Sequence, residues 1–595
     1  MVASLRHRGP DGQGVHLDGP VGLGHTRLAI VDLNETGRQP MERDGVVMVY
    51  NGELYNSGAL REELEERGWR FRGTSDSEVL LASFLTWGRA VFPRLNGMFA
   101  AAFWDGSALT LVRDRFGIKP LFVGRTKRGV VFGSEPKAVL AGRRHDAQLD
   151  DAALHEFLYY GTALGHRTMF RGIERLLPGH TLVIDADGER VERYWDPATL
   201  APQFMGHQMA VEGLRARLDT AVSDHLMSDV PVGVFLSGGI DSSAIAILAA
   251  RHYGGTLKTF TAGFDFAGGV DELPQARALA QELGTDHHEL HIKGGDLAAV
   301  IEALVAAHDQ PFSDAANIPL YLLCEAVGDS AKVILQGDGG DEIFAGYRRY
   351  VQTAWSGALQ GLSRGRGLIR GAGIQRDRAL KMLDAFALTD PALRIAAITT
   401  QERLGAPLEV LSADARRRVE ATDPFGRFRE VLETLHHLDP VQQHLYADAQ
   451  ILLPDVFLEK VDKPTMAHSI EVRVPFLDAH LAAYAMALPS KYKVRGRQKK
   501  WVLRQALRGV VPDRILDAPK QGFGVPYADW LRTSLRPWME EVLFDADFAS
   551  WGLVDPARLR MAVDDHVSRR RNRGFFLYKM LNLALWRARY GVSVG

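Results

Sequence analysis

The sequence contains a single cysteine, Cys324, in 595 residues. One thiol excludes internal disulfides and clusters of metal-binding cysteines, and it is typical of a reducing cytoplasm. Net charge is nearly absent as well, because 71 Lys and Arg oppose 73 Asp and Glu. Such a balance provides no general surface for nucleic acid or acidic membranes. We therefore expect a cytoplasmic protein whose partners are small molecules.

Long hydrophobic runs are also missing. No run approaches the ~18–20 apolar residues of a membrane span, and the first residues, MVASLRHRGPD, lack the apolar core of a signal peptide. The composition, 46% hydrophobic and 24% charged, is that of a folded globular enzyme. At roughly 100–200 residues per domain, the length predicts two to four domains.

The first predicted domain, residues 1–198, is rich in short apolar or alternating runs separated by turns. These runs predict a mixed α+β domain dominated by sheet, which closes before the aperiodic stretch Asp196–Pro202. Helices are expected at Gly58–Arg67 and Ser77–Trp87. Strands are expected at Val46–Tyr50, Phe99–Trp104, Ala108–Arg113, Val130–Phe132 and Thr181–Ile184.

The second predicted domain, residues 209–595, alternates apolar strands with helices, which indicates a parallel sheet with crossover helices. After Tyr350 the chain is predicted to be wholly helical, with a break at Ser363–Arg370. Strands are expected at Val230–Leu236, Lys258–Phe264, His288–His291 and Lys332–Leu335. Helices are expected at Ser242–His252, Glu272–Leu283, Leu297–His308 and Pro319–Val327.

A glycine-rich turn joins the first of these strands to a helix in residues 230–243, VPVGVFLSGGIDSS. Backbone N–H groups, hydroxyls and a helix N-terminus would all point at one anion there. The lysine of a GxxxxGK[ST] loop is missing, so a different nucleotide chemistry is expected, with Asp241 holding Mg²⁺. The other donors would come from Ser237, Gly238, Gly239, Ser242 and Ser243.

A second glycine-rich loop follows another predicted strand in residues 333–342, VILQGDGGDE. Acidic groups at the carboxyl end of a parallel strand lie where such sheets bind ligands. Carboxylates this close repel each other unless a cation joins them. We expect Asp341 to be a second Mg²⁺ ligand facing Asp241, and Asp338 to orient the substrate or handle a proton.

Together with the head of the chain, these loops resemble the glutamine-hydrolysing asparagine synthetases over nearly the whole sequence. That family joins a class II glutamine amidotransferase domain of the Ntn-hydrolase type to an ATP-pyrophosphatase domain. The resemblance therefore implies an α+β Ntn-hydrolase-like domain, here without its first strand, followed by a parallel α/β domain with a helical C-terminal region. It is carried by His7–Asp11, Gly24–Leu33, Tyr50–Asn56, Gly73–Val79, Arg113–Leu121, the two loops, Glu459–Asp478 and Lys520–Leu531.

The resemblance assigns glutamine-binding roles to four residues of the first domain. Arg27 would pair with the α-carboxylate of glutamine and Asp76 with its α-ammonium group. Asn51 and Glu53 would complete the pocket, and Asn51 with Gly52 would form the oxyanion hole.

In the second domain the resemblance implies that ATP and Mg²⁺ are used to activate aspartate. Leu236 and Ala262 would frame the adenine, and Lys500 would lie near the α-phosphate. Gln336 and Gly337 would approach the nucleotide, although many members carry Ser where Gln336 stands. The aspartate carboxylate would attack the α-phosphorus to give β-aspartyl-AMP, which ammonia arriving through an interdomain tunnel would convert to asparagine.

The family's nucleophile is an N-terminal cysteine, about two dozen residues before the position that Met1 occupies. Two explanations stay open. Either the reading frame begins upstream and glutamine is the nitrogen donor, or the protein uses free ammonia.

The acceptor is also open, because Ser313–Pro319 would border its pocket without an arginine to hold the α-carboxylate of aspartate. Alternatives are a related ligase that activates another carboxylate and a non-catalytic family member. His287, His288 and His291 on a predicted strand favour packing over metal binding, and the run Arg569–Arg571 favours a solvated helix face over nucleic-acid binding. A homodimer is one assembly that we expect.

Overall fold

The computed structural model describes residues 1–127, 129–143, 147–200, 202, 204–264, 272–292, 297–365, 374–518 and 524–594. Residues 366–370 of the predicted break lie outside these ranges, as does Lys520–Phe523 of the last motif.

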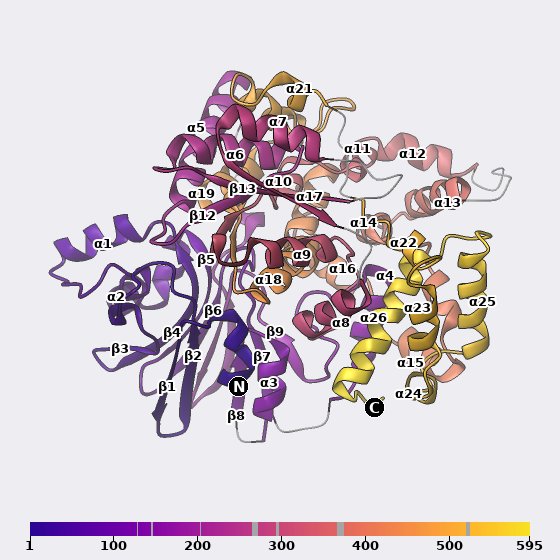
Figure 1. The fold of residues 1–595 in the computed structure, drawn as a ribbon, viewed down its shortest axis with the longest axis horizontal. Coiled ribbons are helices and arrows are strands. Elements are labelled where there is room, and N and C mark those ends of the chain that lie inside the picture. Colours follow the sequence, from indigo (N-terminus) through magenta and orange to yellow (C-terminus); the bar gives the residue numbers. More distant parts are fainter. Residues whose placement is uncertain are drawn as a thin grey trace.

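The N-terminal domain is built on a six-stranded antiparallel sheet in the order β11-β10-β6-β5-β4-β3. A hairpin, β1-β2, and a three-stranded sheet, β8-β7-β9, form separate sheets beside it (Figure 1). The helices expected near residues 58 and 77 are α1 (Ser57–Glu66) and α2 (Asp76–Trp87). The strands are β1 (Gly12–Asp18), β2 (Val21–Arg27), β3 (Met41–Arg43), β4 (Val46–Leu54), β5 (Gly97–Trp104), β6 (Leu109–Arg113), β7 (Phe122–Thr126), β8 (Gly129–Gly133), β9 (Ile173–Arg175), β10 (His180–Asp185) and β11 (Gly188–Arg193).

Side chains of β4 alternate between two apolar layers, as the period of a strand requires. Val46, Met48 and Tyr50 pack in a cluster with residues of α1 and α2. Val47 and Val49 pack on the opposite face, in a cluster with residues of β2, β7 and β10. The central strands β4, β5 and β6 are therefore buried on both faces, which explains why they are so apolar.

Strand β4 is longer than the sequence predicts, because it continues from Tyr50 through Leu54. Asn51 and Gly52 have low strand propensity, but they pair with Ala100 and Phe99 of β5. Pairing with a distant strand therefore places this whole segment on the sheet.

The second domain contains a five-stranded parallel sheet in the order β14-β13-β12-β15-β16. Its strands are β12 (Val232–Phe235), β13 (Lys258–Phe264), β14 (Asp286–Ile292), β15 (Val333–Leu335) and β16 (Glu471–Arg473). The helices between them are α6 (Ile240–His252), α7 (Leu273–Leu283), α8 (Leu297–His308) and α9 (Asn317–Val327). The predicted fold class is confirmed.

The prediction that the chain is wholly helical after Tyr350 is wrong at β16. Its three residues pair in parallel with β15, with Glu471 opposite Val333 and Arg473 opposite Leu335. A strand this short has no periodicity to detect, and it exists because β15 offers a free edge. The remaining C-terminal elements run from α10 (Gly340–Phe344) to α26 (Gly574–Tyr590) and are mostly helices.

The two domains share an apolar boundary. One cluster of buried residues joins Met98, Phe116 and Ile118 of the N-terminal domain to strands and helices of the second. Figure 1 shows the N-terminal sheets at the lower left, the parallel sheet above them and the last helices at the right. Among the described residues, no helix has both the length and the apolar character that a membrane crossing requires.

One buried carboxylate organises the turn after β6. Asp114 accepts hydrogen bonds from the backbone N–H groups of Phe99, Phe116, Ile118 and Lys119, at 2.9–3.1 Å. Its side chain is fully buried. A buried backbone N–H group without a hydrogen-bond acceptor destabilises the folded protein. The Asp114 carboxylate supplies the acceptor for these four groups.

We predict that Asp114→Ala lowers the free energy of unfolding by about 3 kcal/mol or more, because it leaves several buried donors unsatisfied. Urea unfolding followed by intrinsic fluorescence would measure the change. Asp105→Ala is the matched control, since Asp105 accepts backbone N–H groups of Ser107 and Ala108 in an exposed turn. Equal destabilisation by both substitutions would contradict the role assigned to Asp114.

Candidate active site

A cavity of about 500 Å³ lies at the carboxyl ends of β12 and β15. The order of the strands along the chain reverses between β12 and β15. Parallel sheets of this kind usually bind ligands at the carboxyl ends of the strands where the order reverses. Both predicted glycine-rich loops line the cavity, as do Lys460, Lys500 and Asp314. The structure thus brings together segments separated by more than 200 residues.

The first loop is held in a tight turn by its own hydroxyls. The Ser237 and Ser242 Oγ atoms are 2.7 Å apart, and the backbone N–H of Gly239 donates to the Ser237 Oγ at 3.2 Å. Helix α6 begins at Ile240, earlier than predicted, so Asp241 lies in its first turn. The positive end of this helix and the loop N–H groups therefore face the cavity.

Lys500 lies between the two predicted Mg²⁺ ligands. Its Nζ is 2.5 Å from Asp241 Oδ2 and 2.6 Å from Asp341 Oδ1. Burial disfavours the ammonium, but the two carboxylates raise the pKa of Lys500 above its ordinary value. The lysine is therefore charged, and it offsets the repulsion between two acids that the fold brings together.

The backbone that follows α10 leaves no space for a side chain beside Lys500 and its two carboxylates. Gly346 follows α10, and a Cβ at this position would overlap Asp341 Oδ1 and Lys500 Cε. The backbone N–H of Gly346 donates to the Asp341 carbonyl at 2.8 Å. The glycine therefore lets the backbone approach the ion pair closely.

A second lysine, Lys460, enters the cavity from a different helix, and sequence reasoning did not single it out. Its Nζ is 3.3 Å from Asp338 Oδ1. Although burial disfavours its charge, Asp338 and Asp314 raise the pKa of Lys460. The only signal in the sequence was the density of charges in the EKVDK motif, on a helix that is otherwise buried.

Glu342 adds a buried acid to the same wall. Its Oε1 accepts a hydrogen bond from the Tyr347 hydroxyl at 2.5 Å. Burial, together with the neighbouring Asp341 charge, raises the pKa of Glu342 to about 7. Glu342 and Tyr347 both line the cavity.

The opposite wall is apolar. Leu236 and Ala262, predicted to frame an adenine, are buried there beside Phe260 and Leu323. Gln336 and Gly337 also line the cavity, and Gln336 Oε1 is buried without a hydrogen-bond partner among the described residues. Ser243 differs from the other predicted residues, because it is fully buried and does not line the cavity.

The residues present fit a magnesium ion. Asp241 and Asp341 both approach the Lys500 Nζ, so their carboxylate oxygens converge on one small volume that opens to the cavity. Carboxylates are the donors that Mg²⁺ prefers in phosphate-binding sites.

In the N-terminal domain, three of the four predicted glutamine-binding residues lie close together. Asp76 accepts hydrogen bonds from the Tyr50 hydroxyl at 2.7 Å and the Leu54 N–H at 3.0 Å. Burial raises the pKa values of Asp76 and Glu53. The Asn51 Nδ2 is buried and has no hydrogen-bond partner among the described residues.

Of the other predicted residues, Arg27 belongs to β2 and Gly52 to β4. Arg27 ends β2 and donates to the carbonyl oxygens of Asp32 and Asn34. Gly52 has φ +155°, and a Cβ there would overlap the Met98 carbonyl oxygen. Only glycine fits this position of β4 without displacing β5.

The second domain reaches this region through Arg473 of β16. Its Nη2 lies 2.7 Å from Glu53 Oε2, and its Nε lies 3.0 Å from Glu471 Oε1. All three side chains are buried. Sequence reasoning gave neither Glu471 nor Arg473 a role in the site, and the link to Glu53 depends on a contact between domains that no local pattern reveals.

The other candidate features take part in ordinary contacts. On β14, His287 and His291 lie beside Glu289 and His288 beside Asp286. Among the described residues no group of three or more potential ligands could hold a metal ion. Cys324 is buried in α9, where burial raises the pKa of its thiol.

Comparison with known proteins identifies the two domains. Residues 213–588 match the asparagine synthase family, and residues 1–195 match the glutamine amidotransferase domain. The chain belongs to the asparagine synthase family. This membership confirms the predicted class of enzyme, a carbon–nitrogen ligase.

Relatives of this family member cover most of its length. It is 30% identical to asparagine synthetase [glutamine-hydrolyzing] 1 of Bacillus subtilis, over 98% of this chain and 92% of that protein. A putative asparagine synthetase [glutamine-hydrolyzing] of Mycobacterium bovis is 34% identical, with the same coverage. A protein named amidase chyE from Penicillium rubens is 30% identical over 94% of this chain and 89% of its own.

We predict that Gly346→Ala lowers the affinity of this asparagine synthase family member for ATP at least about 100-fold, or about 2.7 kcal/mol. The added Cβ would displace Asp341 or Lys500, which line the cavity and are predicted to lie at the phosphates. Titration calorimetry with ATP and Mg²⁺ would measure the change. Gly357→Ala is the control, because a Cβ there meets open space; equal affinity in both variants would refute the prediction.

Proposed function

We propose that the protein catalyses ATP-dependent amidation of aspartate to asparagine through a β-aspartyl-AMP intermediate. The observation that supports this most directly is the convergence of Asp241, Asp341 and Lys500 in one cavity, at the carboxyl ends of adjacent parallel strands. An acyl-adenylate site needs an anion cradle, a divalent-ion site and a second pocket for the carboxylate. The residues that line this cavity could provide all three features.

In the first step, a carboxylate oxygen of the acceptor attacks the α-phosphorus of ATP and pyrophosphate leaves. The loop Ser237–Ser242 would hold the departing phosphates with its backbone N–H groups and hydroxyls. Lys500 would offset the negative charge that develops on the phosphate oxygens. Leu236 and Ala262 would hold the adenine through the apolar wall and their backbone groups.

Asp241 and Asp341 would hold Mg²⁺ against the phosphates. When bound, the ion neutralises phosphate oxygens and orients the leaving group. These two acids also keep Lys500 fixed and protonated.

In the second step, ammonia attacks the activated carbonyl carbon and AMP leaves. Asp338, 3.3 Å from Lys460, would orient the acceptor or accept a proton from the attacking nitrogen. Glutamine would supply the nitrogen from a pocket that contains Arg27, Asn51, Gly52, Glu53 and Asp76. Free ammonia would serve the same step directly.

Lys460 would supply the cation that the SDAANIP segment lacks, by pairing with the α-carboxylate of the acceptor. Asp314 and Asp338 flank this lysine and would accept the α-ammonium group. One observation favours a second candidate, a ligase for a different carboxylate, because a relative of similar identity is named an amidase rather than a synthetase. The homodimer and the cytoplasmic location stay predictions.

The test is pyrophosphate release measured with ATP, Mg²⁺, aspartate and ammonium chloride. We expect one pyrophosphate and one AMP per asparagine formed, with no release when Mg²⁺ is removed by a chelator. Glutamine replaces ammonium chloride in a parallel assay to identify the donor. Glutamate and short peptides with a free carboxylate replace aspartate to identify the acceptor.

Release that requires another carboxylate, but not aspartate, would exclude aspartate and support the second candidate. Absence of pyrophosphate release with every carboxylate would refute the ligase proposal altogether.

A second prediction concerns the acceptor pocket. Lys460→Met should raise the KM for the acceptor about 10-fold or more while changing the KM for ATP less than twofold, because a charge-assisted contact contributes about 1.5–3 kcal/mol. Steady-state pyrophosphate release at saturating ammonium chloride would measure both constants.

Lys258→Met is the control, since Lys258 begins β13 of the parallel sheet and donates to the Ser330 carbonyl, and neither residue lines the cavity. A rise in the KM for ATP as large as the rise for the acceptor would show that Lys460 does not serve the acceptor specifically.

A further inference from the structure

Helix α18 (Glu459–Met466) carries four charged residues within five positions, and nearly all of the helix is buried. It follows directly on a π-helical segment, Leu453–Leu458. Such segments often occur at functional sites, where they shift the direction of a helix. Each of the four charged residues pairs with a residue outside α18. They are Glu459, Lys460, Asp462 and Lys463.

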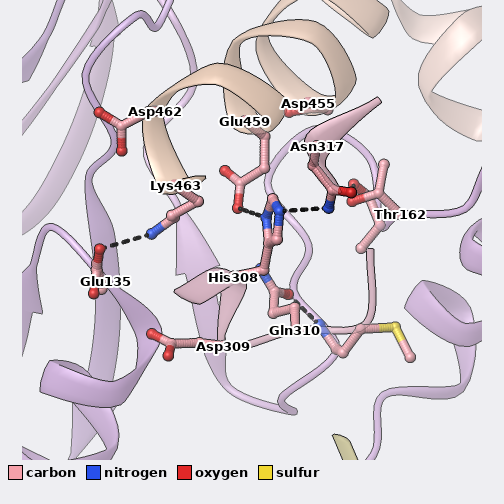
Figure 2. A network of polar contacts seen from close by, with 12 residues as sticks. Glu135, Thr162, His308, Asp309, Gln310, Asn317, Asp455, Glu459, Asp462 and Lys463 are labelled. Carbon is pink, nitrogen blue, oxygen red and sulfur yellow. Dashed lines mark hydrogen bonds and ion pairs between the residues drawn. The ribbon is translucent and has the colours of Figure 1, made fainter. Parts of the chain in front are cut away.

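Two of the charges contact the N-terminal domain. Asp462 accepts two hydrogen bonds from the Arg8 guanidinium, at 2.8 and 3.0 Å. Lys463 Nζ is 3.5 Å from Glu135 Oε1, and Arg8 donates to the same oxygen at 2.9 Å. Figure 2 shows Lys463 pointing from the helix toward Glu135.

This joint is buried on both sides of the domain boundary. Arg8, Glu135 and Lys463 are each 5% exposed or less. Burial disfavours the charge of Glu135, but Lys463, His7 and Arg8 hold its pKa well below the ordinary value. Removal of one partner would leave a buried charge uncompensated, so the joint fixes the helix firmly against the N-terminal domain.

Of the other two charges, Lys460 lines the cavity and Glu459 contacts a residue that does not line it. Lys460 contacts Asp338, as described above. Glu459 Oε1 is 3.7 Å from the Nδ1 of His308, whose Nε2 is 3.2 Å from the Asn317 side chain (Figure 2). Asn317 begins α9, whose Pro319 and Leu320 line the cavity.

We propose that α18 is the element through which the N-terminal domain positions the acceptor pocket. Arg8 and Glu135 fix Asp462 and Lys463, and the same rigid helix then places Lys460 at Asp338. Asp462 and Lys463 are therefore positioning residues for the amidation site. The inference rests on the proposed function, because its kinetic effect is read at the acceptor.

Arg8→Lys tests this inference, because lysine keeps the charge but loses the two-pronged contact with Asp462. We expect at least a fivefold rise in the KM for the acceptor, with less than a twofold change in the KM for ATP, when ammonium chloride is the donor. Ammonium chloride makes the result independent of glutamine hydrolysis. Lys332→Met is the matched control, since Lys332 crosses the same boundary to Asp11 at 2.9 Å without touching α18.

The double variant Arg8→Lys/Lys460→Met separates positioning from a general structural effect. If α18 carries the influence through Lys460, the two substitutions together should raise the acceptor KM no more than Lys460→Met alone. A rise equal to the product of the single effects would overturn the inference. So would an Arg8→Lys protein whose acceptor KM is unchanged.

Hydrogen exchange gives a readout that does not require turnover. Arg8→Lys should accelerate amide exchange severalfold in residues 459–466 and in residues 337–344, whereas Lys332→Met should not. Acceleration confined to residues 1–12 would overturn the inference even if the protein proved inactive with aspartate. Lys463→Arg disturbs the same joint and serves the same comparisons if Arg8→Lys does not fold.

The two proposals fail in different ways. If Lys460→Met leaves the acceptor KM unchanged, the acceptor role of Lys460 is wrong. The exchange pattern of Arg8→Lys still decides whether α18 connects the domains.

Discussion

The ammonium group of Lys500, held between Asp241 and Asp341, is the interaction on which the synthetase site depends. The parallel sheet places two acidic loops at the ends of adjacent strands, and their carboxylates would repel each other in a cavity with limited water. One buried cation removes that repulsion in the protein without ligand. The same arrangement suits a metal and a triphosphate, because the site already balances two carboxylates against a positive side chain. The lysine therefore links folding of the loops to the chemistry proposed for them.

The boundary between the domains also contains buried charges that neutralise one another. It combines an apolar cluster with buried charges that are paired across the boundary, among them Arg8 with Asp462 and Arg473 with Glu53. Apolar contacts contribute most of the association free energy but tolerate sliding. Buried ion pairs tolerate very little displacement of one domain against the other, because a displaced partner leaves a buried charge without its counter-charge. The pairs therefore specify one relative placement of the N-terminal domain and the cavity of the second domain.

Much of the fold and part of the site follow from local sequence patterns. The SGG turn, the GDGGD turn and their flanking strands are visible because strand, turn and helix signals adjoin within about fifteen residues. Strand β16 is invisible, since its three residues acquire strand geometry only by pairing with β15. Lys460 and Arg473 were not assigned to the site for a similar reason. Their partners, Asp338 and Glu53, lie more than 100 residues away, and nothing near them in sequence distinguishes a cavity-lining charge from a structural one.

The density of charge on α18 has a physical consequence for catalysis by two domains. An acyl-adenylate hydrolyses readily, so it should form only where ammonia arrives and water does not. A loop could not hold two distant pockets in register, because each of its residues relaxes independently. In α18 the residue that contacts Asp338 and the two that contact Arg8 and Glu135 lie within four positions of one buried helix, so on this proposal a displacement at Arg8 reaches Lys460. In the proposed role, α18 gives up the stability that apolar residues would provide and fixes the geometry between the two domains instead.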